Sequence, residues 1–305
     1  MAAKLTILFL VLLAGCIPKQ SEEIDWQAFS GRRAYEHVER IISHGPRTTA
    51  SPSLIKTATY IGTQLQECGL DAEEQVFVAP TPRGPLQFRN IIGKSRVRPG
   101  STGKVIIIAS HYDTKYLPNI NFIGANDGGS SAGVLLEMAR VASGVPDLWF
   151  VFFDGEECVK EYGTNDGLWG STYFVQELKG KKRLDRVQAM ILLDMVGDAN
   201  LNITMPANSH RGLVQRVFDA ARSTGNRDYF SFGEMATLDD HVPFVQAGIP
   251  SVDMIDFEFG SAPGLNDYWH TEKDTLDKIS PRSMEVVGQT ALRLVDSLRK
   301  NPKLN

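Results

Sequence analysis

Two short apolar runs constrain the fold of this chain more than any other feature. They cover residues 105–109 and 148–153, are rich in β-branched and aromatic side chains, and are bounded by turn residues. Runs of this kind are typical of buried parallel strands. Because residues 133–143 between them have the apolar spacing of a helix, the stretch predicts a strand, a helix and a second, parallel strand.

The rest of the chain continues this alternation. Further strand-like runs cover residues 73–79, 88–93, 189–195 and 251–255. Helical spacing recurs over residues 34–42, 53–68, 171–178, 211–223 and 283–298. The alternation predicts an α/β fold with a mixed, mostly parallel central sheet sandwiched between helices. We expect a single catalytic domain over residues 31–305, because α/β domains often reach about 250 residues or more.

The first sixteen residues have the pattern of an export signal. Lys4 precedes an apolar run over residues 5–13, which is too short to span a membrane and is followed by Ala14, Gly15 and Cys16. Leu-Ala-Gly-Cys resembles the bacterial lipobox, whose cysteine becomes the lipidated first residue of the mature protein. The alternative is an ordinary signal in which the cysteine occurs by chance.

The lipobox resemblance sets the expected location. We expect an exported protein whose only link to the membrane is a lipid on Cys16, with residues 17–30 as a polar tether. The residue after the cysteine is Ile17 rather than an aspartate, which resembles the pattern of lipoproteins destined for the outer membrane. The domain would then face the periplasm or the exterior. The net charge of −4 gives no reason to expect a nucleic-acid partner.

Polar side chains gather where the predicted strands end, which is where open α/β sheets place ligands and chemistry. The candidate metal ligands are His111, Asp127, Glu157, Asp194 and His270. Imidazole nitrogen and carboxylate oxygen are ligands of zinc, and a catalytic zinc keeps one coordination position open. These residues therefore predict a zinc site at the carboxyl edge of the sheet.

Two neighbours of these ligands suggest further roles. Asp113 shares a strand face with His111 and is expected to bond the other ring nitrogen of that histidine. Glu156 precedes Glu157, so one carboxylate can bind metal while Glu156 stays free as a general base with a raised pKa. Each motif alone also has a plain interpretation as a turn, a cap or a surface pair. Their joint occurrence at successive strand ends favours the metal site.

Six segments resemble the zinc exopeptidase superfamily, which contains aminopeptidases and animal-type glutaminyl cyclases. The segments are HYDTKY, GANDGG, FFDGEE, LLDMVGD, DDHVPF and WHTEKDTLDKI. The resemblance covers nearly all of the mature chain and implies the three-layer fold of that superfamily. For an aminopeptidase it implies two zinc ions, with Asp127 bridging, His111, Glu157, Asp194 and His270 as the other ligands, and Glu156 as base.

Several details resemble the cyclases more closely, in particular bacterial cyclase-like lipoproteins. They include HYDTKY, DDHVPF, WHT and the long loop over residues 158–169. Cyclases hold one zinc, which implies Asp127, Glu157 and His270 as ligands. Glu156 would then move the proton, with Asp194 and Asp239 as a hydrogen-bonded relay. The substrate pocket would be formed by Trp269, Leu265 and Tyr162, the last standing where cyclases carry a tryptophan.

The resemblance leaves three functions open. The first is a zinc-dependent glutaminyl cyclase that converts the N-terminal glutamine of peptides or proteins to pyroglutamate and releases ammonia. The second is a zinc aminopeptidase that hydrolyses N-terminal residues. The third is a metal-free binding protein on the same fold, which the complete set of ligands disfavours. The cyclase is the preferred interpretation, because loop length, DDHVPF and WHT resemble cyclases.

Overall fold

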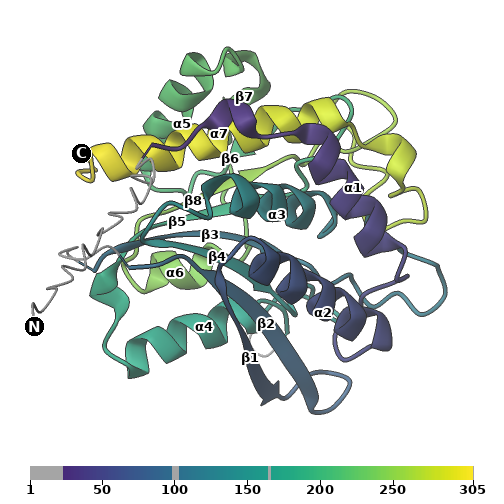
Figure 1. Cartoon of the computed structure of the whole chain (residues 1–305). Helices are drawn as coiled ribbons and strands as arrows, with labels where there is room; N and C mark the ends of the chain where they lie inside the picture. The colour runs from purple at the N-terminus through teal and green to yellow at the C-terminus, as the bar shows by residue number, and fades with distance from the viewer. Residues whose placement is uncertain (1–22, 98–102, 164–165, 305) are drawn as a thin grey trace, which may run out of the picture.

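The computed structural model describes residues 23–97, 103–163 and 166–304. Its centre is an eight-stranded sheet in the order β1-β2-β4-β3-β5-β8-β6-β7 (Figure 1). The strands are β1 (Asp71–Ala79), β2 (Leu86–Lys94), β3 (Val105–His111), β4 (Leu148–Phe153), β5 (Val187–Asp194), β6 (Ile203–Met205), β7 (Phe230–Phe232) and β8 (Ser251–Ile255). The four central strands β4, β3, β5 and β8 run parallel, whereas β2 pairs with β4 and β6 with β8 in antiparallel fashion.

Helices cover both faces of the sheet. The helices are α1 (Gly31–Ile42), α2 (Pro52–Glu67), α3 (Ser130–Ala142), α4 (Trp169–Gly180), α5 (Arg211–Ser223), α6 (Val242–Gln246) and α7 (Pro281–Lys300). One face packs against α1, α2, α3, α5 and α7, and the other against α4 and α6. The three-layer architecture predicted from the sequence is therefore confirmed.

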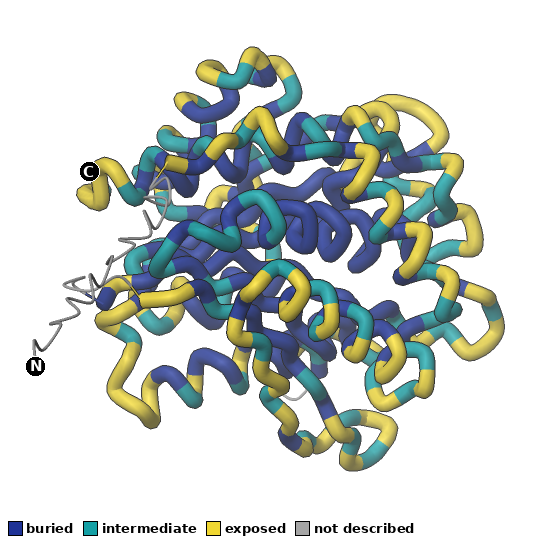
Figure 2. Tube along the Cα trace, in the orientation of Figure 1, coloured by how far each residue is buried: buried dark blue, intermediate teal, exposed yellow. Residues whose placement is uncertain are grey.

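The pleat of the central strands explains the two cores. Ile106 and Ile108 of β3 pack into the core beneath α3, whereas Ile107 and Ala109 pack toward α4 and α6. Successive side chains of a strand point to opposite faces, so a strand buried on both faces must be apolar throughout. Figure 2 shows this burial as a continuous dark band along the central strands and α3. The result is a rigid support for the polar residues at the strand ends.

The helix ends follow local sequence signals. Ser30 and Ser51 accept the backbone N–H groups of Arg33 and Leu54, which caps α1 and α2. Ser280 caps α7, whose first residue is Pro281. The predicted elements at 211–223 and 251–255 match α5 and β8, while β6, β7 and α6 were not predicted because they span only three to five residues.

The prediction of a tether over residues 17–30 is wrong for residues 24–30. Residues 24–30 pack on the domain, because Ile24 and Phe29 are buried and the Ser30 N–H donates to Glu137 Oε1 of α3 (3.0 Å). The Phe29 ring lies against Gly288 of α7, where a Cβ would come within 2.2 Å of it. A glycine there leaves the space that the ring occupies. The predicted signal, Cys16 and residues 17–22 lie outside the described residues.

Across the described part of the chain, no helix is both long enough and apolar enough to span a membrane.

We expect Phe29→Ala to lower the free energy of unfolding by about 3–5 kcal/mol, because it removes a buried ring and leaves a cavity beside Gly288. Urea unfolding would measure the change. Phe232→Ala is the matched control, since the Phe232 side chain is 50% exposed and should contribute much less. Equal losses in the two variants would contradict the packing of residues 24–30 on the domain.

Candidate metal centre

Four neighbouring strands deliver polar residues to one edge of the sheet. His111 ends β3 and Asp194 ends β5, while Glu156 and Glu157 follow β4. Asp127 lies between β3 and α3, and His270 lies in the loop that follows β8. This is the carboxyl edge of the parallel strands, where open α/β sheets bind their ligands.

The first donor set contains Asp127, Glu157 and His270. His270 Nε2 lies 3.1 Å from Glu157 Oε1 and 3.2 Å from Asp127 Oδ2. A tetrahedral zinc with bonds of about 2.0–2.1 Å holds its ligand atoms roughly 3.3 Å apart. One imidazole and two carboxylates at this spacing, with a position left open, therefore fit a zinc ion.

The second donor set shares Asp127. His111 Nε2 lies 3.2 Å from Asp127 Oδ1 and 3.0 Å from Asp194 Oδ1. The two oxygens of Asp127 thus face different histidines, as a bridging carboxylate would. The spacing is compatible with a second metal ion, and equally with hydrogen bonds from a protonated His111.

The histidines and carboxylates stabilise each other's charge when no metal is bound. Burial alone would lower the pKa of His270, but Glu157 and Asp127 raise it to about 9. Burial likewise opposes protonation of His111, and Asp194, Asp113 and Asp127 raise its pKa well above the usual value. Asp127 shows the converse effect: despite its burial, the two histidines hold its pKa below the usual range.

Glu156 is a buried carboxyl group held by Tyr162. The Tyr162 hydroxyl lies 2.9 and 3.1 Å from its two carboxylate oxygens and donates to them. Burial, with the like charges of Asp239 and Glu157, raises the pKa of Glu156 well above its usual value, although His111 opposes the shift. A buried carboxyl group with a raised pKa can accept and return a proton near neutral pH. Tyr162 was predicted only as a pocket wall, so its contact with Glu156 is a new feature of the site.

The position of Asp113 corrects one expectation. Its Oδ1 lies 3.5 Å from His111 Nδ1, which is longer than a normal hydrogen bond. Instead, Asp113 accepts the backbone N–H groups of Glu156 and Glu157 at 3.2 and 3.3 Å. It therefore fixes the turn that presents both glutamates.

A group of buried acids lies behind Glu156. Burial, followed by the charges of Asp194 and Asp240, raises the pKa of Asp239. Burial and Asp239 raise the pKa of Asp253, a β8 residue that sequence reasoning missed. Burial lowers the pKa of His241 to about 4. The expected direct bond between Asp194 and Asp239 is not formed among the described residues, because Asp194 pairs with His111 and Asp239 accepts the Asp240 N–H.

A pocket of about 230 Å³ opens onto these groups. Trp269 forms one wall and stacks on His270 with ring centroids 3.8 Å apart, and Phe257 packs against it edge-on. Tyr162 and Leu238 also line the pocket. Leu265, which was predicted to line it, does not; its side chain is 46% exposed instead.

Three positioning residues escaped the sequence prediction. Asp274 accepts the backbone N–H groups of Asn126 and Asp127 at 2.6 and 3.0 Å. Arg47 is fully buried and donates to the carbonyls of Tyr112, Ile123, Gly124 and Asp127. Lys115 Nζ lies 3.5 Å from Glu157 Oε2. Backbone carbonyls carry no sequence signature, so Arg47 offered no signal, whereas Lys115 in HYDTKY and Asp274 in WHTEKDTLDKI lie in segments that resemble the superfamily.

Comparisons with known proteins agree with this geometry. Residues 90–295 match the model of Peptidase family M28. A glutaminyl-peptide cyclotransferase-like protein of Bos taurus is 29% identical over 271 residues, which cover 77% of this chain and 67% of that protein. The crystal structure of an Acidobacteriales bacterium glutaminyl cyclase superposes with a TM-score of 0.83 at 35% identity, covering 89% of this chain and 95% of that one. A Zn-dependent exopeptidase from Parabacteroides distasonis gives a TM-score of 0.76 at 28% identity and covers 88% and 98%.

Zinc binding should release protons. Because the pKa of His270 is raised to about 9 without metal, the ring is protonated at neutral pH and must lose its proton to coordinate zinc. We expect zinc affinity to fall about tenfold for each displaced proton and each unit of decreasing pH between pH 8 and 6. Calorimetric titration in two buffers with different ionisation enthalpies measures the zinc affinity and the number of protons released.

Two variants frame this test. His270→Ala should lose zinc binding together with its proton release, whereas His210→Ala, outside both donor sets, should retain both. An affinity that does not change between pH 6 and 8 would show that His270 is not a ligand.

Proposed function

Because the chain belongs to peptidase family M28, we propose that it is a zinc-dependent glutaminyl cyclase that converts the N-terminal glutamine of peptides or proteins into pyroglutamate. The observation that carries the proposal is the similarity to a solved glutaminyl cyclase at 35% identity over 89% of this chain. The pocket supports it, since about 230 Å³ is smaller than the ~300–1,000 Å³ of sites for drug-sized ligands. A single side chain such as glutamine suits that size.

The proposed zinc ligands are Asp127, Glu157 and His270, whose donor atoms have the spacing of a tetrahedral site. When bound, zinc would polarise the γ-carbonyl of the substrate glutamine. Asp274 orients Asp127 through the backbone, and Lys115 lies beside the second oxygen of Glu157. These contacts hold the donors in place before the metal binds.

Glu156 is the proposed proton carrier. It accepts a proton from the attacking α-amine while the bond between that nitrogen and the γ-carbon forms. It then gives the proton to the amide nitrogen, so that the γ C–N bond breaks and ammonia leaves. One proton moves from one nitrogen to the other, and no further reactant is needed. The raised pKa of Glu156 suits it to both steps.

The groups around Glu156 assist in different ways. Tyr162 holds the carboxylate through its hydroxyl, and the neighbouring acids Asp239 and Glu157 add to the effect of burial in raising the pKa of Glu156. Trp269 walls the pocket and covers one face of the His270 ring by stacking on it. Asp239 therefore acts on Glu156 through charge, whereas Asp194 pairs with His111.

One observation favours a second function. His111, Asp127 and Asp194 form a complete second donor set, which a two-zinc aminopeptidase would need. In that case Glu156 would take a proton from the attacking water, and the first peptide bond would be hydrolysed. The similarity to cyclases ranks this function second, and the products of the two reactions differ in mass.

The test uses the chain from Ile17 loaded with zinc and a short peptide that begins with glutamine. We expect mass spectrometry to show an intact peptide that has lost one ammonia. Glu156→Gln should lower kcat by at least about a hundredfold, since it removes the proton carrier. Its zinc content should remain unchanged, because Glu157 is the proposed ligand.

The conservative variant Tyr162→Phe serves as the control, because it keeps the carboxylate and the aromatic wall and should retain part of the activity. Release of free glutamine with a shortened peptide would show an aminopeptidase instead.

We also propose that the exported chain is anchored by a lipid on Cys16, on the basis of the Leu-Ala-Gly-Cys segment. In a bacterial host, the full chain should partition into Triton X-114 detergent, and Cys16→Ser should move it to the aqueous phase. A Cys16→Ser variant that stays in the detergent phase would contradict the anchor.

A further inference from the structure

Exposed basic side chains gather at the amino edge of the parallel strands, opposite the metal centre. They come from the segment after β2, the residue before β3, and the end of α4 with the turn that follows it. We call this group the basic pole; its members are Arg96, Lys104, Lys179, Lys182, Arg183 and Arg186. Its concentration of positive charge stands out in a chain whose net charge is −4.

Little of this charge is neutralised by the protein itself. The neighbouring Lys94 pairs with Glu73, and Lys181 pairs with Glu177. Arg186 Nε donates to the Gly103 carbonyl at 3.1 Å, a contact that leaves its positive charge uncompensated. In the described residues, no carboxylate forms a salt bridge with any of the six members of the basic pole, although the exposed Asp71 and Asp185 lie in the same region.

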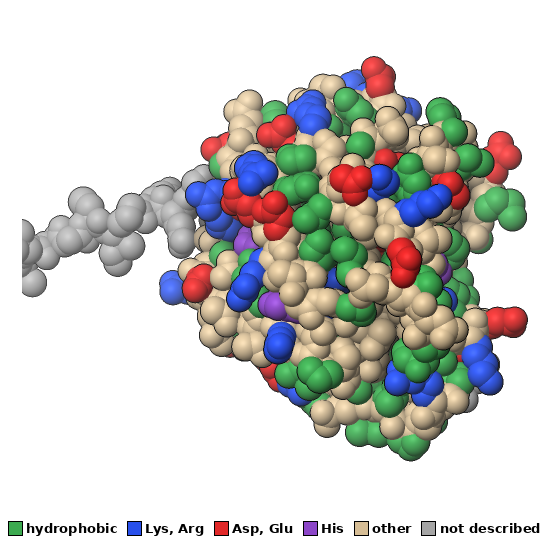
Figure 3. Space-filling model, turned by 90° about the vertical axis from the view of Figure 1, so that its right-hand side faces the viewer, with side chains coloured by type: hydrophobic (Ala, Val, Ile, Leu, Met, Phe, Trp, Pro, Cys, Tyr) green, Lys and Arg blue, Asp and Glu red, His purple; other side chains and the backbone are tan. Residues whose placement is uncertain are grey.

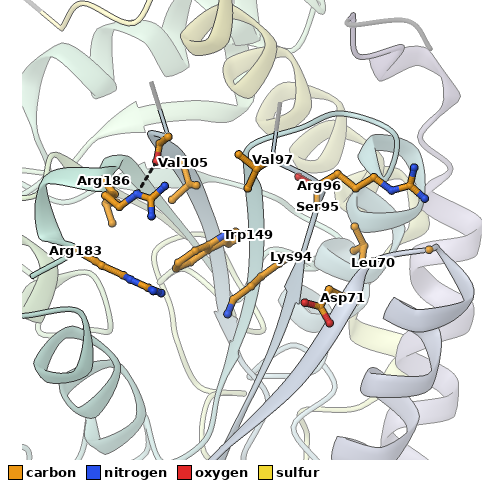
Figure 4. Close-up of a pocket in the computed structure, with 13 residues that line it drawn as sticks. Leu70, Asp71, Lys94, Ser95, Arg96, Val97, Val105, Trp149, Arg183 and Arg186 are labelled. Atoms are coloured by element: carbon orange, nitrogen blue, oxygen red, sulfur yellow. Dashed lines mark hydrogen bonds between the residues drawn. The ribbon is translucent and has the colours of Figure 1, made fainter. Parts of the chain in front are cut away.

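The surface between these cations is hollowed and partly apolar. A pocket of about 580 Å³ lies there, with Trp149, Leu70 and Val105 on its walls (Figure 4). Lys94 Nζ lies 5.0 Å from the centre of the Trp149 ring, and Arg183 points toward the same ring. Val97, at the rim, is 62% exposed. Cations combined with a partly buried tryptophan and an exposed apolar tip are typical of surfaces that contact lipid headgroups.

The described chain also begins at this end of the molecule. Glu23 forms a salt bridge with Lys300 at the end of α7 (2.6 Å), and the neighbouring Leu298 carbonyl accepts from Gln188 at the start of β5. The end of α7 and the end of α4 lie on the same side in Figure 1. Glu23 is the seventh residue after Cys16, and seven residue steps span at most about 25 Å. A lipid on Cys16 would therefore hold this end close to the bilayer.

We propose that the basic pole docks on a membrane surface that contains anionic phospholipid, with the catalytic pocket facing away from the bilayer. Positive side chains near such a surface gain electrostatic attraction that falls off within a Debye length of about 8 Å. On the opposite face of the molecule, drawn in Figure 3, acidic, basic and hydrophobic side chains are intermixed. The charge distribution therefore selects one orientation. This inference is independent of the catalytic proposal.

The test measures binding to vesicles by the chain from Ile17, which has no lipid to anchor it. We expect it to sediment with phosphatidylcholine vesicles that contain 30% phosphatidylglycerol, to stay in solution with phosphatidylcholine alone, and to be released by 0.5 M NaCl. Changing Lys179, Lys182 and Arg183 together to Gln should weaken binding at least about tenfold, given the contribution of each cation near an anionic surface. The rate of cyclisation of a soluble peptide should not change, since none of these residues lines the catalytic pocket.

The matched control changes three exposed cations on α1 and α2, namely Arg33, Arg40 and Lys56, to Gln. It has the same net charge as the first variant and should bind vesicles as the unmodified chain does. Equal losses in both variants, or no preference for phosphatidylglycerol, would overturn the proposal. Binding to heparin or nucleic acid without binding to the vesicles would also overturn it, in favour of a polyanionic partner.

Discussion

The site depends on the compensation of charge that is buried at the carboxyl edge of the sheet. Asp127 has almost no contact with solvent, and each of its oxygens faces a different histidine. A buried carboxylate is costly unless it is paired, so the two rings and the aspartate constrain one another. Zinc at the first donor set would replace the proton of His270 as the positive charge. Zinc binding would therefore neutralise the same buried carboxylate charge that the protonated His270 neutralises without metal.

The sheet separates two kinds of surface. Its carboxyl edge carries the acids, the histidines and the pocket, whereas its amino edge carries the basic pole. Parallel strands make this separation possible, because all their carboxyl ends lie at one edge. A single fold can therefore place chemistry on one side and an electrostatic contact on the other, with the apolar strands as a rigid spacer between them.

The sequence predicts what is encoded locally. The strands β3 and β4 and the residues at their ends follow from periodicity and turn residues, because burial on both faces requires continuous apolar runs. Contacts between distant segments carry no such signal. Phe29 was assigned to a tether because it packs against Gly288, which is far from it in the sequence. Arg47 was missed because its partners are backbone carbonyls. The basic pole also joins separate segments, so it becomes visible only in the fold.

The central claim is that the site closes the N-terminal glutamine of a peptide to pyroglutamate and releases the γ-amide nitrogen as ammonia. The most direct measurement follows a peptide whose N-terminal glutamine is labelled with ¹⁵N at the γ-amide, by NMR during turnover. The account predicts that labelled ammonium and pyroglutamyl peptide form in equal amounts. Labelled free glutamine, with the ¹⁵N still in its side chain, would contradict it and assign the site to peptide-bond hydrolysis.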